Sequence, residues 1–505
     1  MVFVDMMLFV LLVGCWCWPV VFAAHGDPLP PGIAQFLRTR RSEKSRHLRN
    51  GYVRLGDYAG IQGVVQSLTG YSLSMNAVGN MMAVGAPGEE GDFSFERGAV
   101  RVFEFASGTW TQKGQDIIGK LDDSESFGFA VWLSPDGQTL AASANSASHG
   151  YVQVYEINAS GDTWIKRGVD LDELNPGEGF GRSIALSDDA VFMVVGAPFY
   201  DEGADTEVGR LYFFDYRDGS NYVLRTEQLV FSLVPLDRGQ AATQQMGSAV
   251  AMSSDGKFVA VGSPFDQNDL EKGLVFVLSI LWGFFVNLEV FGGVIEADES
   301  GTSFGLALAM NGDGTHLAVG SPFFDGLVDS AGRVQVFSRA TEQGTSTWIQ
   351  LGSSIDGLDA LLNFGTSIAM SASGTTIIVG APGAFFDEND GYTRLYKYNG
   401  NEWLLQEISR VQGTDIIDDF DNQGEIGFAV AISRLGDKIA VGAPQPDVDG
   451  LGRVQAFGQT EFPTFSPIIN PLPQVSSSPS GTSTWRVITT AFSDAMSFVT
   501  EFFSR

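Results

Sequence analysis

Residues suited to metal or thiol chemistry are scarce in this sequence. Its 505 residues include only two cysteines and four histidines. Both cysteines, Cys15 and Cys17, lie in an apolar segment near the N-terminus, so the rest of the chain has neither a disulfide nor a thiol nucleophile. The histidines are His25, His47, His149 and His316. None of them stands beside a plausible nucleophile, so we assign no catalytic, cofactor-binding or metal-ligating residue.

Basic residues are scarce as well. Lys and Arg number 30 against 60 Asp and Glu, which gives a formal net charge of -30. Nucleic acids and anionic membrane surfaces bind clustered Lys and Arg, so the composition argues against both as main partners. In contrast, the chain is 44% hydrophobic and contains 61 glycines. It is therefore too apolar to be disordered as a whole, and its glycines indicate many tight turns.

Residues 1–24 have the character of a signal peptide. The apolar run 6–24 ends in small residues, which predicts cleavage near Ala23 or Ala24 and an extracellular or cell-surface protein. The first five residues contain Asp5 and no Lys or Arg, unlike an ordinary signal peptide. The alternative is an uncleaved signal anchor, for which the apolar run is just long enough.

A basic leader, residues 25–50, precedes the main domain, which we place at 51–459. We expect this leader to be flexible, because its charges repel one another. Within it, RTRR (38–41) matches a processing-protease site and RHLR (46–49) matches a short targeting pattern. Both patterns also arise by chance in basic sequence.

Two segments follow the main domain. Residues 460–483 are rich in Pro and Ser, as in an extended linker. In residues 484–505, apolar side chains recur at helical spacing, which predicts an amphipathic helix. This helix would dock on the main domain or associate with a partner or a membrane surface.

The main domain consists of seven copies of one unit. Each copy begins with a glycine, usually after Phe, and a second small residue follows fifteen positions later. The opening glycines are Gly70, Gly128, Gly181, Gly247, Gly305, Gly365 and Gly427. The second small residues are Gly85, Ser143, Gly196, Gly262, Gly320, Gly380 and Gly442. A constant spacing inside copies of variable length predicts a rigid two-stranded hairpin joined by adjustable loops.

Each copy also predicts a third strand, and the first six copies predict a fourth. The third follows a glycine, as in VRVFEF (100–105), and the fourth begins at an aromatic residue with a glycine four positions later, as in Trp110–Gly114. Seven copies of four antiparallel strands describe an all-β fold, a seven-bladed β-propeller. The seventh copy lacks a fourth strand, whereas YVRLG (52–56) carries that strand's signature. We therefore predict that this N-terminal strand closes the last blade and the ring.

One segment permits a competing interpretation. LVFVLSILWGFFVNL (274–288) is apolar enough for a transmembrane helix. The repeat register instead places the third and fourth strands of the fourth blade here, with a turn near Trp282 and Gly283. We expect strands, because a helix would interrupt the seven-fold pattern, and we expect no membrane span beyond the leader.

Segments such as FGRSIAL (180–186) and VVGAP (194–198) make the chain resemble the FG-GAP repeat family, whose best-known propeller is that of integrin α subunits. The resemblance covers residues 52–458 and implies integrin-type blades. Integrin calcium blades carry Asp-x-Asp-x-Asp-Gly between their first two strands, but the turns here, such as MSSDGK (252–257), lack three spaced acids. Integrin-type calcium sites should therefore be absent. The candidates for a weakly held calcium ion are DENDG (387–391) and DVDG (447–450).

Acidic residues concentrate in two classes of loop. Eighteen lie between the second and third strands, and eighteen lie in the loops that lead into the next copy, together 36 of the 60 acids. Propeller topology places both classes at one end of the blades, which we call the loop face. The turns between first and second strands, at the opposite end or hairpin face, hold six. A negative face attracts basic protein segments or divalent cations, although an acidic surface also serves solubility alone.

The expected function is that of a monomeric, non-catalytic recognition or adhesion module that binds an extracellular protein or glycan. One alternative is a carbohydrate-active enzyme, which would show a carboxylate pair with raised pKa values in the central channel. Another is an interaction scaffold held by an uncleaved membrane anchor. Glycosylation at the only sequon, Asn158-Ala159-Ser160, would exclude an intracellular scaffold.

Overall fold

The structure is a computed structural model of the whole chain, and it describes most of residues 52–459. The signal peptide, the basic leader, the linker and the amphipathic helix predicted above lie outside the described residues, as do both candidate calcium segments up to Asp390 and Gly450. The remaining gaps are 57–60, 66, 90–96, 121–125, 147–148, 204–205, 218, 229–243, 266–271, 284–285, 300–301, 327, 343–344, 384–390, 407–424 and 445–450.

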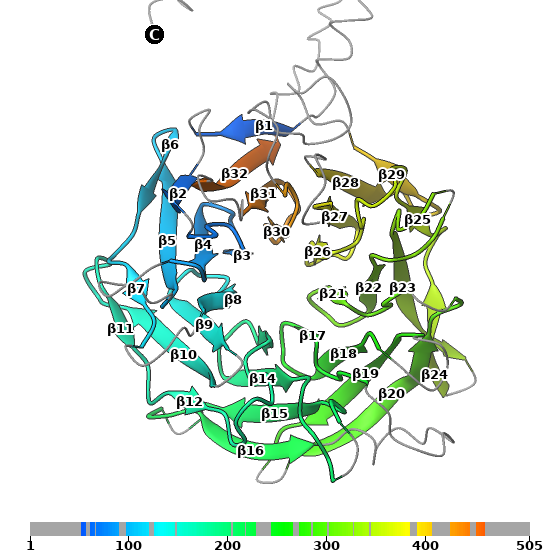
Figure 1. The fold of residues 1–505 in the computed structure, drawn as a ribbon, viewed down its shortest axis with the longest axis horizontal. Coiled ribbons are helices and arrows are strands. Elements are labelled where there is room, and N and C mark those ends of the chain that lie inside the picture. Colours follow the sequence, from blue (N-terminus) through cyan, green and yellow to red (C-terminus); the bar gives the residue numbers. More distant parts are fainter. Residues whose placement is uncertain are drawn as a thin grey trace, which may run out of the picture. The chain divides into compact units, whose positions relative to one another are not determined.

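Seven antiparallel sheets are arranged in a ring, as predicted (Figure 1). In blades 1 to 6 the first strand lies nearest the centre and the fourth lies outside the third, so the chain runs outward through each of these blades. Four blades carry an extra strand that pairs with the beginning of the third strand. The described part of the chain contains no α-helix. The fold is therefore an all-β, seven-bladed propeller.

The strands of the first three blades follow one another in sequence order. Blade 1 contains β3 (Ser72–Met75), β4 (Met81–Ala86), β5 (Ala99–Ala106), β6 (Thr109–Gln112) and β7 (Ile117–Ile118). Blade 2 contains β8 (Phe127–Leu133), β9 (Thr139–Asn145), β10 (Gly150–Ile157), β11 (Trp164–Lys166) and β12 (Leu171–Asp172). Blade 3 contains β13 (Ser183–Leu186), β14 (Phe192–Ala197), β15 (Arg210–Asp215) and β16 (Val223–Gln228).

Blades 4 to 6 repeat this order. Blade 4 contains β17 (Ala249–Met252), β18 (Phe258–Ser263), β19 (Leu274–Leu281) and β20 (Asn287–Glu296). Blade 5 contains β21 (Ala307–Met310), β22 (His316–Ser321), β23 (Arg333–Glu342), β24 (Thr345–Gln350) and β25 (Ile355–Asp356). Blade 6 contains β26 (Ser367–Met370), β27 (Thr376–Ala381), β28 (Tyr392–Tyr398) and β29 (Trp403–Leu405). The apolar segment 274–288 thus forms β19 and the start of β20, which confirms the strand interpretation.

The seventh blade combines both ends of the main domain. Its strands are β30 (Ala429–Ile432), β31 (Lys438–Ala443) and β32 (Leu451–Gln459), followed outward by β1 (Tyr52–Leu55) and β2 (Ile61–Val65). β1 pairs antiparallel with β32, with Tyr52 opposite Gln459 and Leu55 opposite Ala456. The Tyr52 hydroxyl also donates a hydrogen bond to the Gly436 carbonyl. The N-terminal strand therefore closes the ring as predicted.

The fifteen-residue spacing has a direct structural cause. In six blades, the amide of the opening glycine donates to the carbonyl of the small residue fifteen positions later, as Gly181 does to Gly196 at 3.1 Å. A side-chain carbon on that second glycine would stand 1.9 to 2.1 Å from the carbonyl oxygen of the next blade's opening glycine. All seven opening glycines also have φ between 86° and 98°, a region that L-residues rarely adopt. Both glycines therefore allow adjacent blades to approach closely.

The hydrophobic core lies between blades as much as within them. One cluster joins Ile378 and Leu395 of blade 6 to Val430 and Ile439 of blade 7, and it includes Tyr52 from the closing strand. Second strands are almost completely buried, because a blade packs on each of their faces. Small and β-branched side chains suit such strands, which explains why the repeat reads as short apolar runs.

Candidate functional site

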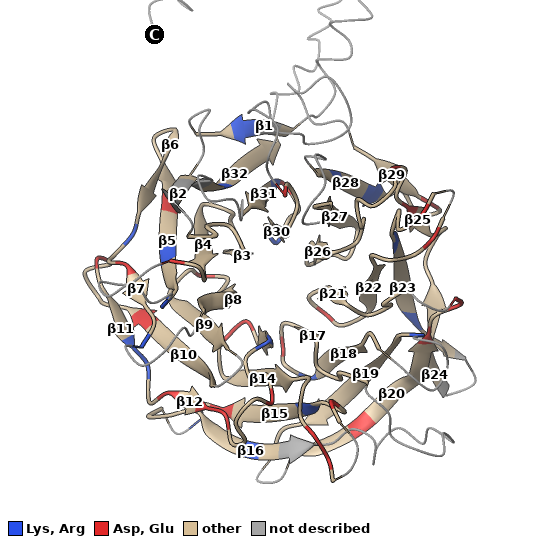
Figure 2. Cartoon of the chain, in the orientation of Figure 1, with Lys and Arg blue, Asp and Glu red and all other residues tan. Residues whose placement is uncertain are grey.

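The two acidic loop classes lie at one end of the blades. In blades 1, 2, 4 and 5, the described part of the loop that leads into the next blade bonds to the glycine at the start of the third strand, as Glu173 N–H donates to Gly150 at 2.9 Å and Gly357 N–H donates to Gly332 at 2.8 Å. The loop that follows the second strand also ends at the start of the third strand. The loop face is thus formed by both classes, and Figure 2 marks their charges around the ring.

Sixteen of the 36 acids assigned to this face belong to described residues. They are Glu89, Asp170, Asp172, Glu173, Glu178, Asp201, Glu202, Glu207, Glu296, Asp298, Glu299, Asp325, Asp329, Asp356, Asp359 and Glu425. Asp298, Glu299, Asp329 and Asp359 are exposed and form no ion pair with another described residue. These four carboxylates of blades 4 to 6 present negative charge directly to solvent.

Other acids of the face are already neutralised by arginine. Arg101 of β5 bonds both to Glu89, at 2.5 Å, and to Asp116, at 2.7 Å. The Arg101 guanidinium beside Asp116 holds the pKa of that carboxyl below its usual range. Arg333 of β23 contacts both oxygens of Asp356. The free negative charge of the face is therefore smaller than the sequence count implies.

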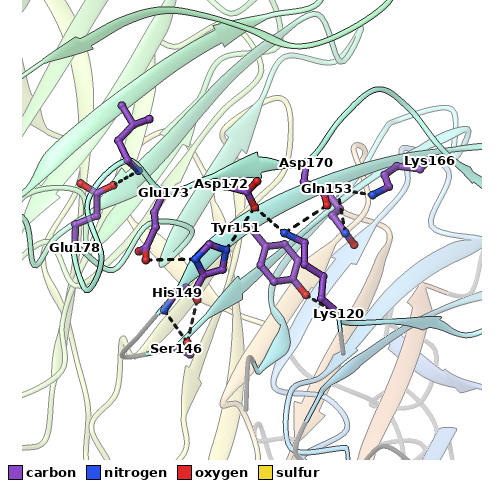
Figure 3. A network of polar contacts seen from close by, with 11 residues as sticks. Lys120, Ser146, His149, Tyr151, Gln153, Lys166, Asp170, Asp172, Glu173 and Glu178 are labelled. Carbon is purple, nitrogen blue, oxygen red and sulfur yellow. Dashed lines mark hydrogen bonds and ion pairs between the residues drawn. The ribbon is translucent and has the colours of Figure 1, made fainter. Parts of the chain in front are cut away.

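A network of polar contacts on this face is built around blade 2 (Figure 3). Lys120 bonds to Asp172 at 2.6 Å and lies 4.1 Å from the centre of the Tyr151 ring. His149 stands between two acids, with its Nε2 3.5 Å from Asp172 and its Nδ1 3.6 Å from Glu173. In blade 2 the loop between the second and third strands is short, from Asn145 to Gly150, and it places His149 beside these acids. No motif or spacing in the sequence indicates that His149 contacts Asp172 and Glu173 of the following loop.

Two of these acids are buried and add no exposed charge to the face. The Glu173 side chain is 2% exposed, and neither of its oxygens has a hydrogen-bond partner among the described residues. Burial raises the pKa of Glu173. Glu178 is also 2% exposed, but it accepts hydrogen bonds from the Tyr212 hydroxyl and from the Leu174 amide. Glu178 therefore anchors the loop, whereas the closest charged partner of the Glu173 carboxylate is His149, whose Nδ1 lies 3.6 Å away.

The strands nearest the centre of the ring carry no charge. The seven first strands read SLSM, FGFAVWL, SIAL, AVAM, ALAM, SIAM and AVAI. None of these described strands contains Asp, Glu, Lys, Arg or His. The carboxylate pair that a glycosidase would place along the central axis is thus missing from them. Glu173, whose pKa is raised by burial, lies instead directly after β12 and beside the start of the third strand, β10.

Aromatic groups form an arc at the loop-face end of the first strands. Phe428, Tyr71, Phe129 and Arg182 each follow an opening glycine, in blades 7, 1, 2 and 3 respectively. The ring centres of Phe428 and Tyr71 lie 4.7 Å apart, and those of Tyr71 and Phe129 lie 5.1 Å apart. The Arg182 guanidinium stands 5.1 Å from the Phe129 ring centre. The sequence signal for this arc is the aromatic residue that directly follows the opening glycine in blades 7, 1 and 2.

The opposite end of the first strands is drawn together by backbone hydrogen bonds. One residue in each hairpin turn contributes, and the bonds measure 2.8 to 3.0 Å. They run Asp188 to Ser254, Ser254 to Gly312, Gly312 to Ala372, Ala372 to Arg434, Arg434 to Ala77 and Ala77 to Pro135. Pro135 has no N–H, so the series stops there. The Arg434 side chain, however, reaches Asp188 of blade 3 at 2.5 Å.

The acidic residues of the hairpin turns accept hydrogen bonds within the turns themselves. In SSDG (253–256), the Asp255 carboxylate accepts from the Ser253 hydroxyl at 2.8 Å and from the Lys257 amide at 3.1 Å. Blades 2 and 3 repeat this contact with Asp136 and Asp189. These carboxylates satisfy turn N–H groups, so they serve local structure.

The described residues contain no group of three or more His, Cys, Asp or Glu side chains arranged to hold a metal ion. Within the same residues, no helix has the length and apolar character needed to cross a membrane.

No protein-family model and no curated protein matches this chain. Solved structures that match include the RRP9 WD40 repeats, at 11% identity and a TM-score of 0.46, over 81% of this chain and 100% of that one. Hydrazine synthase of Kuenenia stuttgartiensis matches at 12% identity and a TM-score of 0.45, over 79% of this chain and 97% of its own. The Dos1 propeller matches at 12% identity and a TM-score of 0.41, over 81% and 94%. These similarities do not bear on function.

Proposed function

We propose that this protein is a secreted or cell-surface recognition module that binds an extracellular protein or glycan through its loop face. The observation that carries the proposal is the division of charge within the propeller. The first strands are uncharged, whereas exposed carboxylates such as Asp298 and Asp329 stand on the loops. A rigid ring that presents variable loops suits binding better than chemistry along its axis.

The repeat unit supports a closer assignment to FG-GAP propellers of the integrin α type, without their calcium loops. Seven opening glycines and the fifteen-residue spacing are the features in favour. The partner would carry basic groups, because the loop face is negative. The arc of Tyr71, Phe129 and Phe428 offers apolar area beside these charges, as recognition surfaces commonly do.

The test is capture of partners from intact cells by the purified full chain, once with calcium and once with a chelator. We expect the same partner to be captured under both conditions. Capture only in the presence of calcium would instead indicate that binding requires a cation site. A variant with Asp298→Asn, Glu299→Gln, Asp329→Asn and Asp359→Asn should associate roughly 10-fold more slowly at low salt. Glu156→Gln with Glu402→Gln removes exposed acids near the hairpin face and should leave association unchanged. Equal effects of the two variants would contradict the proposal.

The enzyme alternative makes a different prediction. If Glu173 were an acid catalyst, Glu173→Gln would abolish glycoside cleavage while the quadruple loop variant retained it. Activity on a panel of oligosaccharides separates these outcomes, and we expect none from the natural chain. The burial of Glu173 and the hydrogen bonds of Glu178 argue for structural roles.

A further inference from the structure

The sequon Asn158-Ala159-Ser160 forms a tight turn between β10 and β11. It matches the acceptor pattern for N-linked oligosaccharide, and the sequence contains no second match. Ala159 and Ser160 are exposed. The turn lies beside the β8–β9 hairpin, because the Ile157 amide donates to Gln138 at 2.9 Å. Asn158 therefore stands on the hairpin face, at the end of blade 2 that is opposite to the loop face.

The side-chain amide of Asn158 uses only some of its hydrogen-bonding capacity. Its Oδ1 accepts from the backbone amides of Asp162, at 3.1 Å, and Thr163, at 3.2 Å. Its Nδ2 donates to the Asp162 carboxylate at 2.8 Å. This bond lowers the pKa of Asp162, together with bonds from the Ser160 and Thr163 hydroxyls. An amide nitrogen has two hydrogens, so one Nδ2 hydrogen takes part in no hydrogen bond with another described residue.

We propose that Asn158 carries an N-linked oligosaccharide in the secreted protein. The donor is a lipid pyrophosphate-linked oligosaccharide. Its anomeric carbon forms a bond to Nδ2, the bond from that carbon to the pyrophosphate oxygen breaks, and Nδ2 gives up one proton to the transferase. The product is a secondary amide that keeps one N–H, which can still donate to Asp162. The Oδ1 contacts to Asp162 and Thr163 are untouched, so the modified side chain fits the turn.

A glycan at this position has a functional consequence. It would cover the hairpin face near blade 2 and would leave the loop face open for a partner. The inference rests on the proposed passage through the secretory pathway, so its test must separate failure of secretion from failure of modification.

Blade 6 supplies a matched control. Its β28–β29 turn is two residues shorter but also begins with an asparagine that caps it: Asn399 Oδ1 accepts from the amides of Asn401 and Glu402, both at 2.9 Å. The substitution Asn401→Thr would create an acceptor pattern at Asn399, on the same face. Position 401 is exposed, so the replacement costs no packing.

The experiment expresses the full chain in eukaryotic secretory cells and compares gel mobility before and after peptide N-glycosidase. We expect one discrete shift for the natural chain, none for Asn158→Gln, and one for Asn158→Gln with Asn401→Thr. A shift only in chains with Asn401→Thr would overturn the inference while leaving secretion intact. No shift in any chain would overturn the secretory localisation and the inference together.

Discussion

At the scale of single residues, glycine decides how closely the blades approach. At the second glycine of the repeat, the backbone of the next blade occupies the space that a side chain would need. At Gly196, for example, the Gly247 carbonyl oxygen lies there. Blade 2 has Ser143 at this place, and its hydroxyl accepts from the Ala130 amide at 3.0 Å. The local strand is correspondingly irregular, with a register shift between Phe127 and Val131. One extra side chain is therefore accommodated by a change in the strand beside it.

A substitution at this seam should destabilise the propeller. In Gly196→Ala the added methyl would stand 2.1 Å from the Gly247 oxygen, so the two blades must move apart. We expect a loss of about 2 kcal/mol, measured by denaturant unfolding. Gly326→Ala is the control, because its nearest neighbour, Phe324, is 3.4 Å away. Equal stability of the two variants would refute this account of the fifteen-residue spacing.

A single buried carboxyl group, that of Glu173, should make the stability of the folded protein depend on pH. Its pKa is raised by burial, so the folded protein binds its proton more tightly than the unfolded chain does. Stability from this group is therefore present at low pH and falls as pH rises from the unfolded pKa through the folded one. Glu173→Gln should remove this loss and raise the thermal midpoint at pH 7.5 by about 1–2 °C, with less effect at pH 4.5.

The exposed Glu156 of β10 provides the comparison for this measurement, since Glu156→Gln should change neither midpoint. A lower midpoint for Glu173→Gln at pH 7.5 would mean that the carboxylate is stabilised by His149 rather than left unsatisfied.

At the scale of elements, the outer strands connect neighbouring blades through tryptophan. The indole N–H of Trp164 donates to Lys113 at 2.9 Å, and that of Trp403 donates to Leu351 at 2.9 Å. Trp110 makes the same contact with Leu55 of the closing strand. Each acceptor precedes the fourth-strand glycine of the previous blade, over which the indole lies. The aromatic-plus-four-glycine signature thus encodes contacts between blades.

Removing one indole N–H should weaken one such contact. Trp403→Phe keeps an aromatic ring but leaves the Leu351 carbonyl without this donor, so we expect a loss of about 1 kcal/mol. Leu404→Ala, on the exposed face of the same strand, should cost at most about 0.5 kcal/mol. Thermal denaturation of both variants checks the difference, and a larger effect of Leu404→Ala would argue against the tryptophan contact.

At the scale of the whole molecule, closure of the ring depends on the N-terminal strands. β1 and β2 both pair with β32, so the first described residues cover the last strand of the domain. Without them, β32 would become an exposed edge, and exposed edges promote association between chains.

Two truncations test closure. A chain lacking residues 1–50 retains both strands and should remain monomeric with a single thermal transition. A chain lacking residues 1–66 should aggregate or melt at lower temperature, as followed by size-exclusion chromatography and calorimetry. If the shorter chain behaved like the longer one, the β1–β32 pairing would contribute nothing to the ring.

The sequence by itself determined the number of blades, the strand order and the closing strand, because each repeat specifies its own local hairpin through spacing and glycine. It also indicated which loops are acidic. Only the tertiary structure decided which of those acids are exposed, since pairing with Arg101 or burial of Glu173 depends on neighbours from other elements. The contact of His149 with Asp172 follows from no spacing in the sequence. Tyr71, Phe129 and Phe428 share one position of the repeat, but only the closed ring brings these residues of different blades into contact.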